Sequence, residues 1–228
     1  MSRTRPLSLV LPLFVVAALS AADPPPAPKT LMTESGKLLF SDDLARPPGK
    51  EWRVAKGKWE PADGGLRGSE RKSDMHGAVM RHAMPFRDVV IQYAFRLDGA
   101  RQTTLSINKA KGHLCRVLVN KAGLTVRKDD SDHDGPDKAV TFETRKTPIE
   151  PGTWHTLVVE LHGKEMAATL DGEHVAFGGH DALDVDKANF GLTVAGESAS
   201  FKDLRVWEAT PKKDREAAKA KLSAGRKE

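Results

Sequence analysis

Cysteine is nearly absent from this chain, and long apolar runs are absent from its interior. Cys115 is the single cysteine among 228 residues, so no intramolecular disulfide and no multi-cysteine zinc or iron–sulfur site can form. No interior run reaches the roughly 18 apolar residues that a membrane span needs. Hydrophobic residues make up 39% of the chain and charged residues 29%, which is the balance of a soluble globular domain.

Common catalytic and metal-binding motifs are also missing. The sequence contains no G-x-S-x-G, no H-E-x-x-H and no glycine-rich phosphate loop. His76 and His82 are six residues apart in an extended segment, about 20 Å at 3.3 Å per residue, which is too far to share a metal. Cys115 alternates with Val117 and Val119, and this pattern predicts a buried thiol rather than a nucleophile.

Positive charge is in excess only at the two ends of the chain. The formal net charge is +5, but residues 211–228 alone carry seven Lys or Arg against three Asp or Glu. Arg3 and Arg5 add two more positive charges at the start. The part between the ends is close to neutral, so we expect no nucleic-acid partner.

The order of residue types divides the chain into four segments. Residues 1–22 have a basic start, an apolar run and small residues, which predicts a signal peptide and a periplasmic or secreted protein. Residues 23–36 begin with DPPPAPK and form a proline-rich spacer. Residues 37–209 form one β-sandwich domain, and residues 210–228 form a charged tail. The tail is expected to be disordered, with a frayed helix or an anionic partner as alternatives.

The segment from 37 to 209 is typical of an all-β protein. Short apolar runs alternate with turn residues such as Asp98-Gly99 and Asp171-Gly172, and no ten-residue window has a convincing helical period. Many short strands at even spacing predict a sandwich or a barrel. The predicted strands are Lys37–Phe40, Trp52–Lys56, Lys58–Pro61, Gly65–Ser69, Gly77–Arg81, Asp88–Leu97, Thr103–Asn108, His113–Val119, Leu124–Lys128, Ala139–Glu143, Trp154–Leu161, Met166–Leu170, Val175–Phe177, Asn189–Ala195 and Ala199–Val206.

One hairpin allows its register to be derived. A two-residue turn at Gly163-Lys164 pairs Leu161 with Met166, Val159 with Ala168 and Leu157 with Leu170. That face is wholly apolar, and a slip of one residue would mix the apolar and polar faces. The other face carries Thr156, Glu160, Thr169 and Asp171.

The same alternation predicts a polar sheet face. In the strand Asp88–Leu97 the odd-numbered residues from Val89 to Leu97 are apolar and point one way, while Gln92 and Arg96 point the other. If the neighbouring strands share this sheet, amides and guanidiniums line one surface, which suits a polyhydroxylated or anionic ligand. An ordinary water-facing sheet surface has the same composition, so both interpretations stay open. The candidate ligand-binding residues are Gln92, Arg96, Asn108, His113 and Arg116.

Several stretches together resemble a known family. They are GKLLFSDDL, WRVAKGKWEPADGGLRG, PFRDVVIQYAFRL, GTWHTLVVELHGKEMAATLDGEHV and ANFGLTVAGESASFKDLRVWEA. The sequence over about Lys37–Ala209 resembles the 3-keto-disaccharide hydrolase domain family, long called a domain of unknown function and labelled laminarinase-like. The most specific parts are Trp52–Gly68 and the hairpin Trp154–Gly172. The family usually has an Asn-Ser-Gly-like stretch leading to an arginine where this chain reads TTLSINKAKGHLCRV, with Arg116 as the candidate counterpart.

The resemblance implies a concanavalin A-like double-sheet jelly roll with its ligand on the concave sheet. It also implies hydrolase or lyase-like activity on keto-glycosides, although the E-x-D-x-x-E string of laminarinase-type enzymes does not occur. Glu160 is the candidate acid–base residue, and an exposed strand residue without catalytic function is the alternative.

An acidic loop gives the sharpest local motif. Asp130, Asp132 and Asp134, followed by Gly135, match the opening of a D-x-D-x-D-G calcium loop. The twelfth position is Thr141, where such a loop has a bidentate glutamate, and the flanks are strands. Calcium is therefore the one candidate cofactor, with a plain acidic turn as the alternative.

Two hypotheses of different classes follow. The first is an exported enzyme that cleaves oxidised glycosides. The second is a non-catalytic module that binds a carbohydrate or another protein. Catalysis needs a titratable group beside the bound sugar, whereas binding needs only hydrogen bonds and a stacking surface.

The first testable prediction concerns the amino terminus. We expect mass spectrometry of the exported protein to find a mature N-terminus between Ala21 and Pro24, because small residues follow the apolar run there. Recovery of intact Met1 on a cytoplasmic protein would reject the expected signal peptide.

Overall fold

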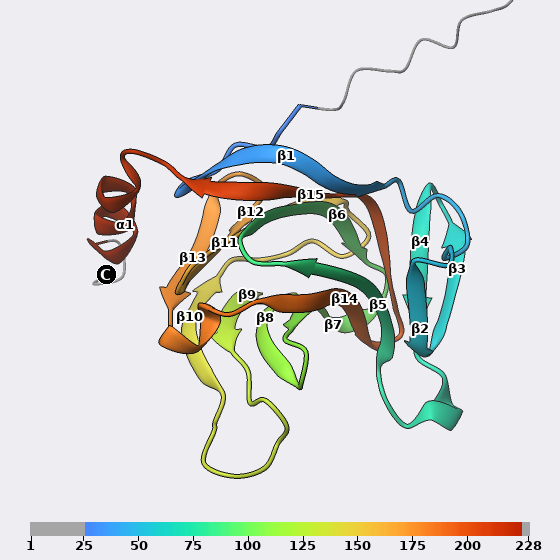
Figure 1. The fold of residues 1–228 in the computed structure, drawn as a ribbon. Coiled ribbons are helices and arrows are strands. Elements are labelled where there is room, and N and C mark those ends of the chain that lie inside the picture. Colours follow the sequence, from blue (N-terminus) through green and yellow to red (C-terminus); the bar gives the residue numbers. More distant parts are fainter. Residues whose placement is uncertain (1–25, 225–228) are drawn as a thin grey trace, which may run out of the picture.

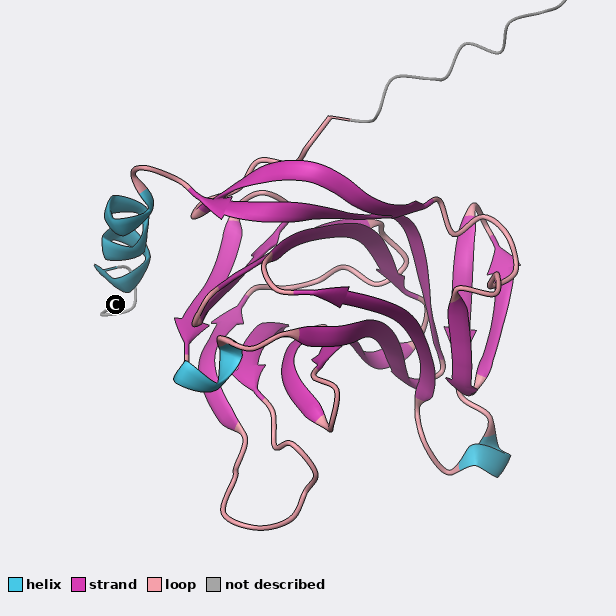
Figure 2. Cartoon of the chain, in the orientation of Figure 1, coloured by secondary structure: helices cyan, strands magenta, loops and turns pink. Residues whose placement is uncertain are grey.

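The chain forms a sandwich of two antiparallel β-sheets. The structure is a computed structural model that describes residues 26–224. These residues form fifteen strands, two short 3₁₀ helices and one α-helix. The sheets pack face to face (Figure 1), and the strands dominate the chain (Figure 2). This confirms the all-β sandwich expected from the sequence. The expected signal peptide at 1–22 lies outside the described residues.

The first sheet, called sheet I below, has eight strands. In spatial order, seven of them are β13 (His174–Gly179), β12 (Glu165–Leu170), β11 (His155–His162), β6 (Val89–Leu97), β15 (Ser198–Pro211), β4 (Gly65–Ser69) and β3 (Lys58–Ala62). The eighth, β1 (Thr33–Asp42), pairs with the C-terminal part of β15, next to the stretch that pairs with β4.

The second sheet, called sheet II below, has seven strands. Their spatial order is β10 (Val140–Lys146), β9 (Gly123–Lys128), β8 (His113–Asn120), β7 (Ala100–Asn108), β14 (Lys187–Gly196), β5 (Ala78–Phe86) and β2 (Trp52–Lys56). The 3₁₀ helices Lys72–Asp74 and Asp181–Leu183 lie in loops before β5 and β14.

The core lies between the two sheets and is built by alternation. The odd-numbered residues of β6, from Val89 to Leu97, all have 0% exposure, as the sequence pattern predicts. Leu105 and Val117 face them from sheet II and belong to the same buried cluster. Burial of each such side chain contributes about 1.5–3 kcal/mol, so this packing fixes which face of every strand points inward.

The predicted hairpin register is confirmed. Leu157 pairs with Leu170, Val159 with Ala168 and Leu161 with Met166, and all six side chains are buried. Gly163 occupies the turn with a φ of +55°, a backbone conformation that glycine adopts without a steric penalty.

The strands of the sandwich extend beyond the expected residues 37–209 at both ends. β1 starts at Thr33, inside the segment assigned to the spacer, and β15 continues to Pro211. Leu38 of β1 packs on Trp207 and Val90 over the outer face of sheet I. The pairing of Thr33–Ser35 with residues 209–211 of β15 extends the strand beyond the predicted Lys37–Phe40.

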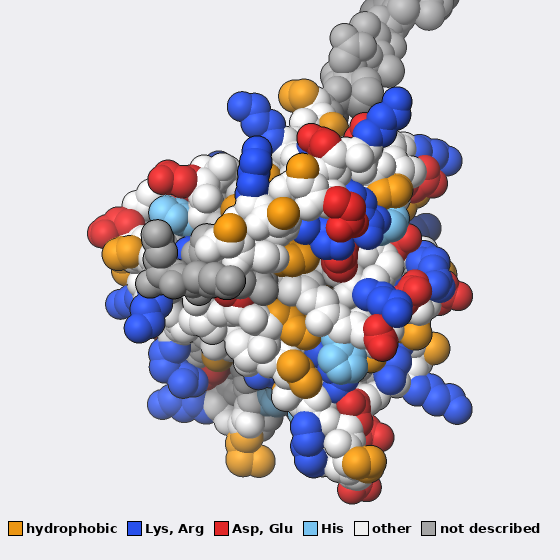
Figure 3. Space-filling view, turned by 90° about the vertical axis from the view of Figure 1, so that its left-hand side faces the viewer, with side chains coloured by type: hydrophobic (Ala, Val, Ile, Leu, Met, Phe, Trp, Pro, Cys, Tyr) orange, Lys and Arg blue, Asp and Glu red, His pale blue; other side chains and the backbone are white. Residues whose placement is uncertain are grey.

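The expected disorder of the tail is also wrong for the helix α1 (Arg215–Ala224). Arg215 and Lys219 both form ion pairs with Glu165 of sheet I, at 3.2 and 2.5 Å. Leu222 packs against a cluster on the outer face of the same sheet that includes Met32. Tertiary contacts of this kind stabilise a helix that would be marginal in isolation. Figure 3, which views the molecule from the α1 side, shows acidic and basic side chains mixed on this face.

Glu160 anchors the start of the domain. Its carboxylate is 1% exposed and accepts hydrogen bonds from the backbone N–H groups of Leu31, Met32 and Thr33, at 2.7–2.8 Å. The Thr33 hydroxyl donates a fourth, at 2.8 Å. The segment is thereby fixed to β11, more than 120 residues away in the sequence. No helix among the described residues has the length and apolarity to cross a membrane.

The second testable prediction concerns this anchor. We expect Glu160→Gln to lower the free energy of unfolding by about 1.5–3 kcal/mol, because an amide replaces a charged acceptor and turns an NH₂ group toward N–H donors. Urea denaturation measures the change. Glu173→Gln is the matched control, since Glu173 is exposed in a turn. Equal stability of the two variants would contradict the anchoring function.

Candidate functional site

The structure divides the predicted ligand-binding residues between two surfaces. Gln92 and Arg96 lie on β6 in sheet I, whereas Asn108, His113 and Arg116 lie on β7 and β8 in sheet II. The expectation that these strands share one polar face is therefore wrong. The chain passes from one sheet to the other between β6 and β7, where the sequence has the hairpin-like turn Asp98-Gly99.

Neither candidate on sheet I lies with the candidates on sheet II. Arg96 is engaged in ion pairs within the protein, and Gln92 lies apart. The guanidinium of Arg96 contacts the carboxylates of Asp98 at 2.6 Å and Asp63 at 3.3 Å, and it lies 5.0 Å from the Trp154 ring centre. Gln92 is opposite Val158 on the same sheet. Glu160 is buried on sheet I with its oxygens bonded to backbone N–H groups, so this geometry supports an anchoring function rather than proton transfer.

The sheet II candidates come together in a hydrogen-bonded chain. The amide nitrogen of Asn108 donates to the side-chain oxygen of Asn189 on β14, at 2.7 Å. The oxygen of Asn108 lies 2.8 Å from Nδ1 of His113. The β7–β14 register places the two asparagines opposite each other, and the β7–β8 register places His113 opposite Asn108.

The hydrogen bond between His113 and Asn108 assigns the tautomer of His113. Because the Asn108 oxygen accepts, Nδ1 of His113 carries the proton and donates, which leaves Nε2 as the basic nitrogen of the neutral ring. Burial lowers the pKa of His113 below its ordinary value, and the positive charges of Arg116 and Arg81 lower it further. The imidazole is consequently neutral at pH 7 and available as a hydrogen-bond acceptor or a base.

A cavity of about 290 Å³ opens beside these three hydrogen-bonded side chains. Besides Asn108, His113 and Asn189, it is lined by Arg53 of β2, Arg81 of β5, Lys109, Ala110 and Gly112. The lining thus contains three permanent cations and no carboxylate. Arg53, Arg81 and Asn189 are not among the residues expected from the sequence. A signal was available for the two arginines, because the buried neighbours Trp52 and Met80 turn them outward by alternation.

Arg116 lies next to this cavity and is held by a buried acid. Nε of Arg116 is 2.5 Å from one oxygen of Asp129, and an Nη atom of Arg127 is 2.9 Å from the other. The side chain of Asp129 is 1% exposed. Burial lowers the pKa of Arg116, as does the repulsion from Arg127 and Arg81, whereas Asp129 opposes this effect. Asp129 therefore positions two guanidiniums on the outer face of sheet II.

The predicted buried thiol is confirmed. Cys115 has 0% exposure and faces the core beside Val117. Burial raises the pKa of Cys115 to about 12, so the side chain stays protonated and is not a nucleophile near neutral pH.

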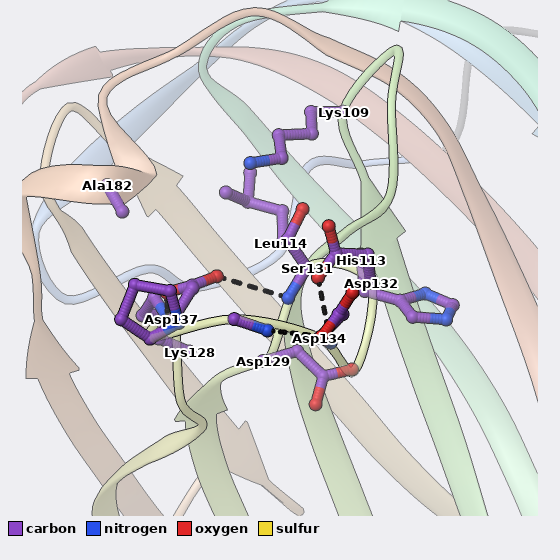
Figure 4. A pocket seen from close by; sticks show the side chains of 12 residues that line it. Lys109, His113, Leu114, Lys128, Asp129, Ser131, Asp132, Asp134, Asp137 and Ala182 are labelled. Atoms are coloured by element: carbon purple, nitrogen blue, oxygen red, sulfur yellow. Dashed lines mark hydrogen bonds and ion pairs between the residues drawn. The ribbon is translucent and has the colours of Figure 1, made fainter.

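The acidic loop borders a second cavity, of about 450 Å³, that shares Lys109 and His113 with the first. Figure 4 shows the Asp137 carboxylate turned toward the backbone nitrogen of Ser131, with which it forms a 3.1 Å hydrogen bond. Asp137 also forms an ion pair with Lys128. These contacts close the loop over the end of sheet II.

The three candidate calcium ligands do not converge in this structure. Asp130, Asp132 and Asp134 each accept a hydrogen bond from a backbone N–H of their own loop, at 2.8–3.0 Å. Among the described residues, no group of three or more His, Cys, Asp or Glu side chains is arranged to hold a metal ion. In this arrangement the loop is an acidic turn, and calcium binding there stays a prediction.

Comparison with known proteins supports the fold without assigning a family. No protein-family model matches the chain, and no curated protein sequence matches it. The resemblance to the 3-keto-disaccharide hydrolase family thus stays a prediction. Solved structures are similar to the chain in their fold, with sequence identities below 20%.

Three of these structures define the architecture. The carbohydrate-binding module CBM66 from Bacillus subtilis is 17% identical, with a TM-score of 0.57 over 69% of this chain and 96% of that one. A galectin-like protein of unknown function from the same organism is 12% identical, with a TM-score of 0.60 over 79% and 100%. The endo-β-1,3(4)-glucanase SCLam of family GH16 is 11% identical, with a TM-score of 0.56 over 78% and 95%. The expected concanavalin A-like jelly roll is confirmed.

The third testable prediction concerns His113. We expect its pKa, measured by NMR titration of the folded protein, to lie below 6.5 and to rise in Arg81→Met, because that change removes a repelling charge. The unfolded chain then binds more protons than the folded one just below pH 6.5, so His113 decreases stability as the pH falls through this range. A pKa at or above that of the same histidine in urea would contradict this description of the site.

Proposed function

We propose that the protein binds a carbohydrate on the outer face of sheet II. The observation that carries this proposal is the chain His113–Asn108–Asn189 beside a cavity flanked by Arg53 and Arg81. Hydrogen bonds hold the asparagine amides in place, and amides with nearby guanidiniums match the hydroxyl pattern of a sugar. The cavity is close to the lower end of the size range of small-molecule sites, about 300 Å³. Two of the similar structures described above are named for carbohydrate binding or glucan hydrolysis, which favours the same ligand class.

A binding function fits the chemistry of this cavity better than glycoside hydrolysis by paired carboxylates. Glycosidases of that type hold two carboxyl groups about 5–9.5 Å apart. None of the residues that line the cavity is acidic, and Asp129, which contacts Arg116 beside it, is engaged by two arginines. The site can therefore orient a sugar without supplying the usual acid and nucleophile.

Cleavage of 3-keto glycosides is the second candidate function, and one observation favours it. Nε2 of His113 makes no hydrogen bond within the described residues, and the lowered pKa of the ring keeps it unprotonated. A keto group at C3 acidifies the C2–H bond, so one base can remove this proton beside a cation that stabilises the resulting enolate. The C1–O bond to the aglycone then breaks as a C1–C2 double bond forms, and the leaving oxygen takes up a proton from water. His113 and Arg81 would supply these two groups. Both functions belong outside the cytoplasm if residues 1–22 are a signal peptide.

The fourth testable prediction separates the site from the rest of the surface. We expect Arg81→Ala and Asn108→Ala to weaken the binding of glycans by about 10-fold or more, the effect of losing a charged or buried hydrogen bond. Binding is measured on immobilised β-glucan, galactan, dextran and polygalacturonate. Arg205→Ala is the matched control, because Arg205 lies on the outer face of sheet I and is 22% exposed.

The same proteins also distinguish binding from catalysis. Incubation with 3-keto-glucosides and their unoxidised parents should show binding without turnover if the site is a binding site only. Turnover that His113→Asn abolishes would replace the binding proposal with the enzymatic one. Absence of binding to every glycan, or equal losses in Arg81→Ala and Arg205→Ala, would refute the site.

A further inference from the structure

Four arginines lie in one row across the outer face of sheet II. The strand register pairs Arg53 with Arg81, Arg81 with Gly191, Gly191 with Ser106, Ser106 with Arg116, and Arg116 with Arg127. These residues come from six adjacent strands, from β2 to β9. Because residues paired across a sheet point to the same face, all four guanidiniums project from one surface.

The centre of the row has almost no side-chain volume. Gly191 and Ser106 lie between Arg81 and Arg116, whose Cα atoms are three strand spacings, about 14 Å, apart. A Cβ atom at position 191 would lie 2.9 Å from Cγ of Arg81, so glycine leaves room for that side chain to extend over the sheet. Gly191 and Ser106 are themselves buried, Ser106 with 9% exposure, so a ligand at the centre of the row contacts the flanking side chains rather than the backbone of these two residues.

Two of the four arginines in the row have no acidic partner among the described residues. Within the described residues Arg53 and Arg81 form no ion pair, and Asp129 is the one acid that contacts the row. Asp129 engages Nε of Arg116, and the terminal nitrogens of that guanidinium have no partner in the part of the chain that the structure describes. Lys109 adds a further cation beside Arg81. The mutual repulsion contributes to the lowered pKa values of Arg116 and His113.

We propose that the carbohydrate bound here is an acidic sugar, whose carboxylate or sulfate group is bound by the guanidiniums of Arg81 and Arg116 at the centre of the row. This inference rests on the proposed function and specifies the ligand class. Terminal guanidinium nitrogens match the geometry of such anions and bind them in pairs. The adjacent chain His113–Asn108–Asn189 holds the hydroxyl groups of the same ring.

A glycan fits this surface better than a nucleic acid. Single-stranded nucleic acids bind through bases that stack on exposed aromatic rings. The exposed large hydrophobic side chains of the described residues are Leu39, Val54, Met75 and Val140, and none of them is aromatic. An anionic sugar can instead be bound through its charge and its hydroxyl groups, by the guanidiniums and amides of this surface.

The fifth testable prediction compares matched glycans with and without charge. Polygalacturonate and its full methyl ester share one backbone and differ in the carboxylate, and dextran sulfate and dextran differ in the same way for sulfate. We expect the full-length protein to bind at least one charged member about 10-fold or more tightly than its neutral partner, and added salt to weaken this binding. Arg81→Gln should reduce the difference within the pair, whereas Arg205→Gln on sheet I should leave it unchanged.

Arg116 needs a conservative change, because its loss would leave the buried Asp129 with a single partner. Arg116→Lys keeps the charge and loses the paired geometry, and we expect it to lower binding of the charged glycan while the melting temperature stays near that of the wild type.

The outcomes separate this inference from the proposed function. Equal binding of charged and neutral partners, lost in Asn108→Ala, would overturn the acidic ligand and leave the sugar site. Equal binding of polyglutamate and polygalacturonate, or stronger binding of single-stranded RNA, would overturn the sugar and show a general anion surface. Binding to none of these probes would refute both proposals.

Discussion

Burial of the inner faces of two sheets is the constraint on which the rest of this structure depends. Side chains alternate across a strand, so fixing one face inward fixes the other face outward. The fully buried row of β6 and its sheet II counterparts Leu105 and Val117 set the register. With that register, the outward residues of six strands align as a row of arginines, and the polar surface is a consequence of the apolar core.

Local patterns are sufficient to predict the strands, whereas the site depends on contacts between distant segments. The register of the hairpin β11–β12 follows from its own residues, since a two-residue turn and one apolar face allow a single pairing. Asn108 and Asn189 are 81 residues apart, and no local pattern indicates that β14 lies between β5 and β7. The sequence Asp98-Gly99 has the appearance of a hairpin turn but carries the chain from one sheet to the other. A turn signal does not show whether the chain stays in one sheet, so the sequence alone could not place Gln92 and Arg96 on another surface than Asn108 and Arg116.

The acids that seemed functional from their positions have structural partners instead. Glu160 faces outward from β11, as alternation predicts, but the segment of Leu31–Thr33 covers it and supplies its hydrogen-bond donors. A charged acceptor bound to several N–H groups is stabilising in a buried position only when all of them are in place. The pairing spans more than 120 residues and involves a segment that appears from its composition to be a spacer. Sequence patterns of either segment alone therefore could not reveal it.

The net charge of the chain does not predict the charge of this surface, because several acids form ion pairs within the protein whereas two of the arginines do not. Asp129 is enclosed by guanidiniums, Asp137 pairs with Lys128, and Asp98 pairs with Arg96, so these negative charges are neutralised within the protein. Arg53 and Arg81 have no such partners among the described residues, and their charge is directed to the solvent. A chain whose central part is close to neutral thus presents a positive face on one sheet. The distribution of ion pairs, rather than the overall balance of residue types, determines which ligands this face attracts.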